Sequence, residues 1–260
     1  MKEHLKSLII LNEGENVELN LGQKMVIQEA IKWFKSRTKQ VFQYSGPPGT
    51  GKTTTLKEIV RNLNIDPARI APMSYIGAAV MNMRRNGLLN ARTIHSWLFN
   101  PTETAKRDEN GKVIYNEYFN TPETTLFFSP KPLHNIDLII LDEASSCPAN
   151  LRPYIESHGI PIIATGDLDQ LPPVRDNPAY LYDEREVYRL TEIMRQSEGS
   201  AIIQIAYAAK DSRPINNGYY NDALVIYEDE LTNEMLLNAD IIICGKNETK
   251  EYYNNYMRSL

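Results

Sequence analysis

The chain has 260 residues, enough to bury a sizeable core in one large domain, or in one domain with part of a second. Its 42% hydrophobic and 23% charged residues are ordinary for a soluble globular protein. A net charge of −5 excludes a protein coated in basic surface, although a local groove with stacking side chains could still bind nucleic acid.

The N-terminal segment and the cysteines argue against membrane-bound and disulfide-stabilised classes. The apolar run at residues 8–11 is too short for a signal-peptide core or a membrane span. Cys147 and Cys244 lie far apart and have no partner at metal-ligand spacing, so we expect reduced thiols. We therefore expect a cytoplasmic protein that does not bind membranes.

Short apolar runs alternate with amphipathic stretches along the chain, which is typical of a parallel sheet with crossover helices. In chain order we expect a helix at 23–36, a strand at 41–44, a helix at 53–63, a strand at 69–73, a helix at 78–86, a strand at 138–141, a helix at 150–158 and strands at 161–165 and 187–190. After residue 195 the pattern resumes with a helix at 200–210, strands at 223–227 and 241–244, and a helix at 247–258. These last elements read as the start of a second α/β domain that stops early.

Residues 99–135 break this alternation. The segment is polar with scattered aromatic residues, and Asn110-Gly111 is a turn signal. It fits either a small hairpin inserted into the first domain or a long surface loop with its own aromatic cluster, and the sequence favours neither.

Residues 46–53 form a glycine-rich motif that satisfies G-x-x-x-x-G-K-[ST] in full, between a strand-like run and a helix-forming run. The glycines let the backbone curl so that successive N–H groups point at a phosphate, and the following helix N-terminus adds partial positive charge. We expect Lys52 to meet the β- and γ-phosphates and Thr53 to give its hydroxyl to Mg²⁺. The expected nucleotide-binding residues of this loop are Gly46, Pro47, Pro48, Gly49, Thr50, Gly51, Lys52, Thr53 and Thr54.

Two carboxylates, Asp142 and Glu143, follow the apolar run at 138–141. Such a run forms a buried parallel strand, and ligands bind at the carboxyl ends of strands in open α/β sheets. We expect the two side chains to face the glycine-rich loop from the tip of the neighbouring strand. Asp142 would hold Mg²⁺ and Glu143 would polarise the attacking water.

The next strand ends in Gly166-Asp-Leu-Asp-Gln170-Leu-Pro-Pro. The amide of Gln170 at such a strand end can lie beside the γ-phosphate and respond to its presence. Pro172 and Pro173 also make this segment a rigid loop, and the two interpretations are compatible.

In order along the chain, these motifs resemble those of the superfamily 1 DNA helicases, particularly the branch that contains RecD and the phage helicase Dda. The resemblance rests on Gln23, residues 46–53, Ala71-Pro-Met-Ser74, Thr93-Ile-His95, Leu141-Asp-Glu-Ala144, Gly166-Asp-x-x-Gln-Leu-Pro-Pro173 and Leu190-Thr-Glu-Ile-Met-Arg-Gln196. It implies a P-loop NTPase fold, with a RecA-like ATPase domain at 1–195, a small inserted subdomain with a hairpin at 99–135, and an incomplete second RecA-like domain at 196–260.

The resemblance also implies roles for individual residues. Gln23 would read the adenine edge, Gln170 would sense the γ-phosphate, and Arg195 would reach the γ-phosphate from the domain boundary. Together with Lys52 and Glu143, Gln170 and Arg195 form the expected catalytic set. Residues from the two segments that touch the single strand in this family are Pro72, Ser74, Thr93 and His95. The hairpin of the insert would serve as a strand-separating pin.

The cofactors and partners implied by the resemblance are ATP, Mg²⁺ and single-stranded DNA, with RNA the less favoured track. A monomer that moves 5′→3′ follows by analogy. A partner protein of replication or recombination fits the family, and a phage-encoded protein would work in the host cytoplasm.

The chain departs from the family in its second domain, where the last two motifs have no counterpart. Because an arginine delivered to the γ-phosphate is worth on the order of 10³–10⁵ in rate, we expect these residues to bind ATP–Mg²⁺, to hydrolyse it slowly and not to unwind duplex DNA unaided. Two alternatives remain: a PhoH-like single-domain ATPase, and an ATP-switched adaptor or helicase loader.

Overall fold

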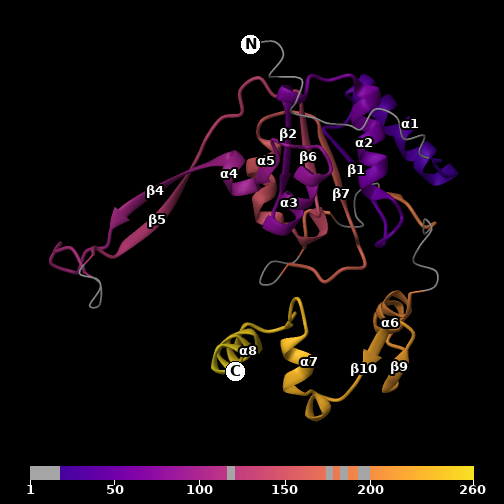
Figure 1. Ribbon diagram of the computed structural model, residues 1–260. Helices are drawn as coiled ribbons and strands as arrows, with labels where there is room; N and C mark the ends of the chain where they lie inside the picture. The colour runs from indigo at the N-terminus through magenta and orange to yellow at the C-terminus, as the bar shows by residue number, and fades with distance from the viewer. Residues whose placement is uncertain (1–17, 116–120, 174–177, 182–186, 193–199) are drawn as a thin grey trace. The chain divides into compact units, whose positions relative to one another are not determined.

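The computed structural model describes residues 18–115, 121–173, 178–181, 187–192 and 200–260 (Figure 1). The chain divides into two compact units, residues 1–195 and residues 196–260. Among the described residues, no helix is both long enough and apolar enough to cross a membrane.

The first unit is built on a six-stranded sheet in which every hydrogen-bonded pair of strands is parallel. In spatial order the strands are β3 (Arg92–Thr93), β2 (Ile70–Ser74), β6 (Leu138–Asp142), β7 (Ile162–Gly166), β1 (Val41–Ser45) and β8 (Tyr188–Arg189). The residues of β2 and β7 are buried throughout, because both faces of the sheet are covered. The α/β fold with a parallel sheet flanked by helices is therefore confirmed.

Helices cover both faces of this sheet, as Figure 1 shows. They are α1 (Leu21–Ser36), α2 (Lys52–Leu63), α3 (Gly77–Arg85), α4 (Ile94–Leu98) and α5 (Arg152–Glu156). Successive side chains of a strand point to opposite faces, so Leu138 and Ile140 join a core with α1, α2 and α3. Ile139 and Leu141 join a second core with α4 and α5. These two cores hold the carboxyl ends of β1, β6 and β7 at one edge of the sheet.

The segment between α4 and β6 is a long antiparallel hairpin, which decides between the two interpretations of the insert. Its strands are β4 (Phe99–Ala105) and β5 (Thr124–Pro130), paired from Phe99 with Pro130 to Ala105 with Thr124. Figure 1 shows the hairpin extending away from the sheet, and every residue of β5 is exposed. The expected turn at Asn110-Gly111 lies beyond these strands, where the N–H of Gly111 bonds to the carbonyl of Asp108.

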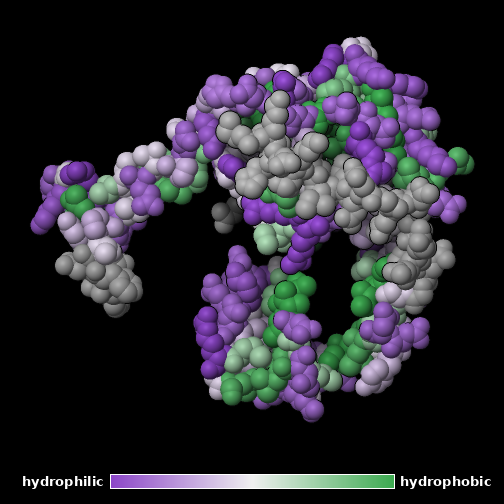
Figure 2. Space-filling model, turned by 45° about the horizontal axis from the view of Figure 1, so that its top comes forward, coloured by the Kyte–Doolittle hydropathy of each residue, from purple (hydrophilic) through white to green (hydrophobic). Residues whose placement is uncertain are grey.

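The second unit contains few buried side chains. Its elements are α6 (Ala201–Lys210), the antiparallel strands β9 (Gly218–Tyr220) and β10 (Ala223–Val225), the 3₁₀ turn η5 (Glu228–Glu230), α7 (Asn233–Leu237) and α8 (Asn247–Ser259). Within residues 200–260, Ala201 and Leu236 are the hydrophobic residues that are fully buried. Figure 2 shows hydrophobic residues at the surface of this unit.

Most expected elements lie within two residues of their predicted bounds, and the exceptions have physical causes. The predicted strand at 241–244 is wrong: Ile241 and Ile243 are 73% and 86% exposed, and this apolar run pairs with no strand among the described residues. The predicted helix at 150–158 is instead the 3₁₀ turn η4 (Ala149–Leu151) followed by α5, which has Pro153 as its second residue and is followed by Gly159 at φ 66°. The strands expected at 187–190 and 223–227 are shorter, as β8 and β10.

Candidate nucleotide-binding and catalytic site

The glycine-rich loop joins β1 to α2 at the carboxyl edge of the sheet. Gly49 and Gly51 have φ values of 84° and 78°, in the left-handed region that glycine adopts without strain. Gly46 is needed for a different reason: a Cβ at this position would lie 2.8 Å from the carbonyl oxygen of Leu190. The N–H of Gly46 also bonds to the carbonyl of Gly166, so the loop starts beside the end of β7.

Lys52 is the first residue of α2, and its ammonium group lies over the start of the loop. It donates to the carbonyl of Gly46 at 2.6 Å and to that of Pro47 at 3.3 Å. The carbonyl of Lys52 accepts a hydrogen bond from the buried hydroxyl of Tyr44, which fixes the first turn of α2. The cation and the first turn of the helix therefore face the same loop, as phosphate binding requires.

Gln23, the expected adenine reader, is 1% exposed and bonds to the glycine-rich loop. Its amide nitrogen donates to the carbonyl of Thr50 at 3.1 Å, and its amide oxygen accepts from the N–H of Asn20 at 3.0 Å. Asn20 in turn caps α1 through a reciprocal bond to the N–H of Gln23. Gln23 thus ties the start of α1 to the phosphate loop, and its amide is engaged by the protein itself.

The two carboxylates emerge at the end of β6, but β6 is not the neighbour of β1. β7 lies between them, which corrects the expected adjacency. Thr53 and Asp142 nevertheless line one small cavity of about 10 Å³ between α2, α3 and the end of β6, together with apolar side chains such as Leu56 and Met83. A hydroxyl and a carboxylate are oxygen ligands of the kind that Mg²⁺ takes.

Burial raises the pKa of Asp142 from its usual 3.8 to about 6, with the charge of Glu143 as a second cause. The N–H of Glu143 and the charge of Lys52 act in the opposite direction. A buried carboxylate of this kind is costly as an anion without a cation beside it. The site therefore favours a positive ion next to Asp142.

Glu143 has an unusual backbone conformation, and one of its carboxylate oxygens is buried without a hydrogen-bond partner among the described residues. Its φ of 53° lies in the left-handed region, which is strained for a residue other than glycine. Its Oε2 is buried and makes no hydrogen bond within the described part of the chain. An oxygen of this kind can accept a hydrogen bond from a bound water.

The remaining expected catalytic residues lie on the loop after β7 and beyond the described residues. Gln170 is exposed, and its N–H bonds to the carbonyl of Asp167, which forms a tight turn. Its amide is thus displayed at the same sheet edge as Glu143. Arg195 lies outside the described residues.

The four expected nucleic-acid contacts fall into two groups. Pro72 and Ser74 are buried within β2, and their side chains do not reach the surface. Thr93 caps α4 by accepting the N–H of Ser96 at 3.2 Å. His95 is half-buried and lies in an aromatic cluster at the root of the hairpin, with its ring centroid 6.0 Å from that of Tyr75 and 5.7 Å from that of Phe128.

Three residues that support this site were missed by the sequence interpretation: Tyr44, Ser145 and Asp167. Tyr44 and Ser145 make side-chain bonds to backbone groups of the site, and Asp167 is buried at 3% exposure. A polar residue inside an apolar strand, such as Tyr44 in β1, was the available signal. Asp167 lies inside the quoted motif at 166–173 without a role assigned to it, and Ser145 directly follows the motif at 141–144.

A parallel sheet with a glycine-rich loop after one strand and an acidic pair after another defines a P-loop nucleoside triphosphatase fold. Residues 18–230 match the model of a protein family described as an AAA domain. The chain belongs to this family. The expected likeness to superfamily 1 helicases is confirmed, and the chain contains a helicase-like NTPase core.

Known proteins with similar sequences include a helicase. The chain is 30% identical over 185 residues to the DNA replication ATP-dependent helicase/nuclease DNA2 of Saccharomyces cerevisiae, covering 64% of this chain and 12% of that protein. It is 24% identical over 290 residues to protein R530 of Acanthamoeba polyphaga mimivirus, covering 92% of this chain and 56% of that protein. Among solved structures, the Pif1 helicase from Candida albicans matches at 19% identity and a TM-score of 0.47, covering 75% of this chain and 44% of that one.

Proposed function

We propose that the chain is the ATP-dependent core of a DNA helicase or translocase that binds ATP–Mg²⁺ and single-stranded DNA. The observation that carries the proposal is that Asp142, at the end of β6, lies within reach of the charge of Lys52 and lines one cavity with Thr53. The chain spans between 12% and 56% of the length of the two relatives named above, so the activity of a whole protein is part of this proposal.

Four residues of the site would each have a separate role in ATP hydrolysis. When bound, Mg²⁺ would supply positive charge that stabilises the negative charge of the phosphate oxygens. The Thr53 hydroxyl and the Asp142 carboxylate would hold it, and Lys52 would neutralise the phosphate oxygens. Glu143 would orient a water through its buried Oε2 and accept its proton, as the water oxygen bonds to the γ-phosphorus and the bond to the ADP oxygen breaks.

The hydrolysis rate proposed for residues 1–260 is low. Catalysis between two RecA-like domains needs two large sheets, and among the described residues 200–260 the sheet consists of the two strands β9 and β10. The exposed apolar run at 241–244 supports this proposal, because such a run is stable as a strand only inside a sheet. The chain would bind nucleotide well and turn it over slowly.

Single-stranded DNA would run along the surface formed by α4, the exposed residue Tyr75 and the root of the hairpin. The ring cluster around His95 supports this proposal, because aromatic side chains stack on unpaired bases without regard to sequence. The exposed hairpin would then separate the strands ahead of the motor, with movement in the 5′→3′ direction by analogy alone. DNA, rather than RNA, is the proposed track.

Nucleotide binding tests the first half of this proposal. Lys52→Ala should weaken ATP–Mg²⁺ binding at least tenfold, since a charge-assisted contact is worth more than about 1.4 kcal/mol. Lys35→Ala, an exposed lysine in the last turn of α1, is the matched control and should bind like the wild type. Equal affinity in the two variants would mean that the loop does not bind the triphosphate.

DNA binding tests the second half. Fluorescence anisotropy with labelled single-stranded DNA, and with RNA of the same sequence, should show tighter binding of DNA that changes between ATP-analogue and ADP states. Tight nucleotide-dependent binding to a protein, with no affinity for either nucleic acid, would favour an adaptor instead.

A further inference from the structure

The turn that carries the catalytic carboxylates is bonded to the loop that displays Gln170, through the hydroxyl of Ser145. Ser145 lies in the one-turn 3₁₀ helix η3 (Ala144–Ser146), which directly follows Glu143. It is 4% exposed, and its Oγ accepts a hydrogen bond from the N–H of Asp167 at 3.2 Å. A buried hydroxyl used in this way joins two loops that are far apart in sequence.

This bond continues the connection between β6 and β7 beyond the end of their ladder. The last paired residues of the two strands are Leu141 and Ala164. Past this pair, Thr165 and Gly166 are paired with β1, so the sheet no longer joins the end of β6 to the end of β7. The Ser145–Asp167 bond supplies that link three residues past Ala164, at the level of the site.

The close approach of the two segments is built into the backbone. A Cβ at Gly166 would lie 2.9 Å from both the N and the Oγ of Ser145. The φ of Gly166 is not positive, so the glycine is required by space rather than by backbone conformation. Glycine at this position therefore lets the loop after β7 press directly onto the η3 turn.

Asp167, the residue bonded by Ser145, organises the turn that ends at Gln170. Its side chain is 3% exposed and accepts the N–H of Asp169 at 3.0 Å, while its carbonyl accepts the N–H of Gln170 at 3.2 Å. A shift of Asp167 would therefore carry the backbone of Gln170 with it.

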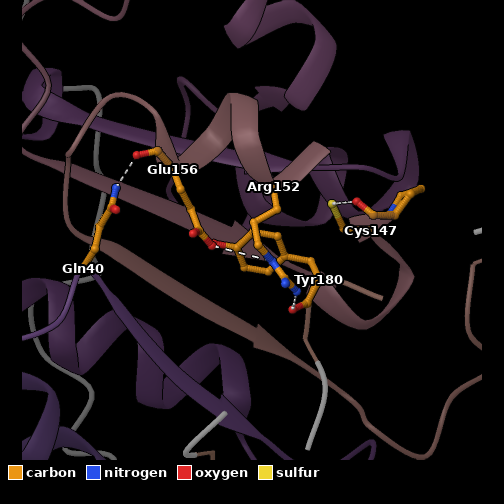
Figure 3. A network of polar contacts seen from close by, with 6 residues as sticks. Gln40, Cys147, Arg152, Glu156 and Tyr180 are labelled. Carbon is orange, nitrogen blue, oxygen red and sulfur yellow. Dashed lines mark hydrogen bonds and ion pairs between the residues drawn. The ribbon is translucent and has the colours of Figure 1, made fainter. Parts of the chain in front are cut away.

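The other side of η3 is held by backbone hydrogen bonds, so a shift of Asp167 would change the conformation of η3 locally instead of displacing the whole turn. The carbonyl of Ala144 accepts the N–H of Leu181, and that of Cys147 accepts the N–H of Tyr180. Figure 3 shows Tyr180 held in turn by Arg152 of α5, which donates to the carbonyl of Tyr180 at 3.0 Å and pairs with Glu156. The η3 turn is thus bonded on one side to Asp167 and on the other to residues 180 and 181, and Arg152 of α5 bonds to Tyr180.

We propose that Ser145 is a positioning residue that couples the γ-phosphate-sensing loop of Gln170 to the water-activating carboxylate of Glu143. The inference rests on the proposed ATPase function. A γ-phosphate that pulls on Gln170 moves Asp167, and the Ser145 hydroxyl passes this movement to η3 and to Glu143 beside it. The strained backbone of Glu143 makes its side chain sensitive to small changes in this turn.

The test compares Ser145→Ala with Ser146→Ala in the full 260-residue chain. Ser146 is the matched control, because it is the same residue type on the same turn and does not bond to Asp167. Ser145→Ala should lower the single-turnover rate of ATP hydrolysis roughly tenfold, the effect of one lost hydrogen bond in the transition state. Its ATP–Mg²⁺ affinity should stay within about twofold of the wild type, since the phosphate loop is unchanged.

A double-mutant cycle with Gln170→Ala separates coupling from a merely structural effect. If Ser145 acts through the Gln170 loop, the double variant should be no slower than the slower single variant. Should Ser145→Ala not fold, Ser145→Cys keeps the side-chain volume with a weaker acceptor and serves in its place.

Each outcome is decisive. The coupling role would be overturned if the rate reductions of the two single variants multiply in the double variant, or if Ser145→Ala hydrolyses ATP as fast as Ser146→Ala. Either result would leave the ATPase assignment intact. A wild-type chain that binds no ATP–Mg²⁺, or binds it without any hydrolysis, would overturn the proposed function and the coupling together.

Discussion

Gly46 offers a sharp test of the phosphate loop, because the space around it can be compared with that around another glycine of the same unit. In Gly46→Ala the new Cβ would meet the carbonyl oxygen of Leu190 at 2.8 Å, and the side chain of Thr50 is closer still. In Gly77→Ala the new Cβ would meet nothing within 4 Å. Gly77 starts α3 and its φ is not positive, so alanine is compatible there.

The two substitutions should therefore change the free energy of unfolding in opposite directions. Overpacking at Gly46 should lower the free energy of unfolding by about 1–3 kcal/mol. Alanine at Gly77 should raise it by up to about 1 kcal/mol, since it restricts the unfolded chain. Gly46→Ala should also weaken ATP–Mg²⁺ binding, because the loop must move to relieve the contact with Leu190.

Urea unfolding followed by tryptophan fluorescence measures this difference in the first unit, where both tryptophans, Trp33 and Trp97, lie. Equilibrium binding of ATP–Mg²⁺ supplies the second readout. If Gly46→Ala unfolds at the same urea concentration as Gly77→Ala and binds ATP equally well, the described geometry of the loop is incorrect.

Three other predictions address the buried acid, the thiols and the hairpin. Because the folded-state pKa of Asp142 is raised to about 6, ionisation of this carboxyl lowers the free energy of unfolding as the pH rises from about 4 to above 6. Asp142→Asn should therefore stabilise the Mg²⁺-free chain by up to about 3 kcal/mol at pH 8 and by almost nothing at pH 3.5. Urea midpoints that differ from the wild type equally at both pH values would refute this. Burial raises the pKa of the Cys147 thiol to about 12, whereas Cys244 is partly exposed. A thiol reagent at pH 8 should therefore label one cysteine per native chain and two after unfolding. Two fast-reacting thiols in the native chain would contradict the burial of Cys147. The ring of Phe128 contacts that of His95, whereas the adjacent Phe127 is 57% exposed and has no ring contact to His95 among the described pairs. Phe128→Leu should therefore weaken single-stranded DNA binding several-fold, at about 1–3 kcal/mol per lost stacking contact, and Phe127→Leu should weaken it less. The reverse order in anisotropy titrations would place the DNA on the other face of the hairpin.

Local patterns predicted the strands and helices of the first unit well, because each is specified by its own sequence. The apolar run before Asp142 and the glycine loop after Ser45 carry their structure within a few residues. Spatial order is different. Nothing local to β6 or β1 indicates that β7 lies between them, since the order of parallel strands depends on crossovers far away in sequence.

One wrong prediction and one open alternative depend on contacts between segments that are distant in the sequence. The run at 241–244 has the composition of a buried strand, but a strand forms only where a neighbour completes its hydrogen bonds. The hairpin strands β4 and β5 contain threonines but also a proline each, so their composition does not separate a hairpin from a loop, and their pairing with each other makes them strands.

The candidate site was predictable where a motif has one chemical meaning and not where a residue acts through its surroundings. Thr53 and Asp142 line one cavity and the charge of Lys52 acts on Asp142, while the roles of these residues stay predictions. Gln23 and Ser74 are buried and bonded within the protein, which a likeness in sequence does not reveal. Ser145 lies close to Gly166, a pairing that only the folded backbone creates.

The Mg²⁺ dependence of ATP binding tests the central claim most directly. Calorimetric titration of ATP into the wild-type chain should show affinity that rises markedly when Mg²⁺ is added, and this gain should be lost in Asp142→Asn and in Thr53→Val, while both variants still bind ATP without the metal. If Mg²⁺ strengthens binding equally in the wild type and in both variants, Asp142 and Thr53 do not meet at the metal, and the site described here is wrong.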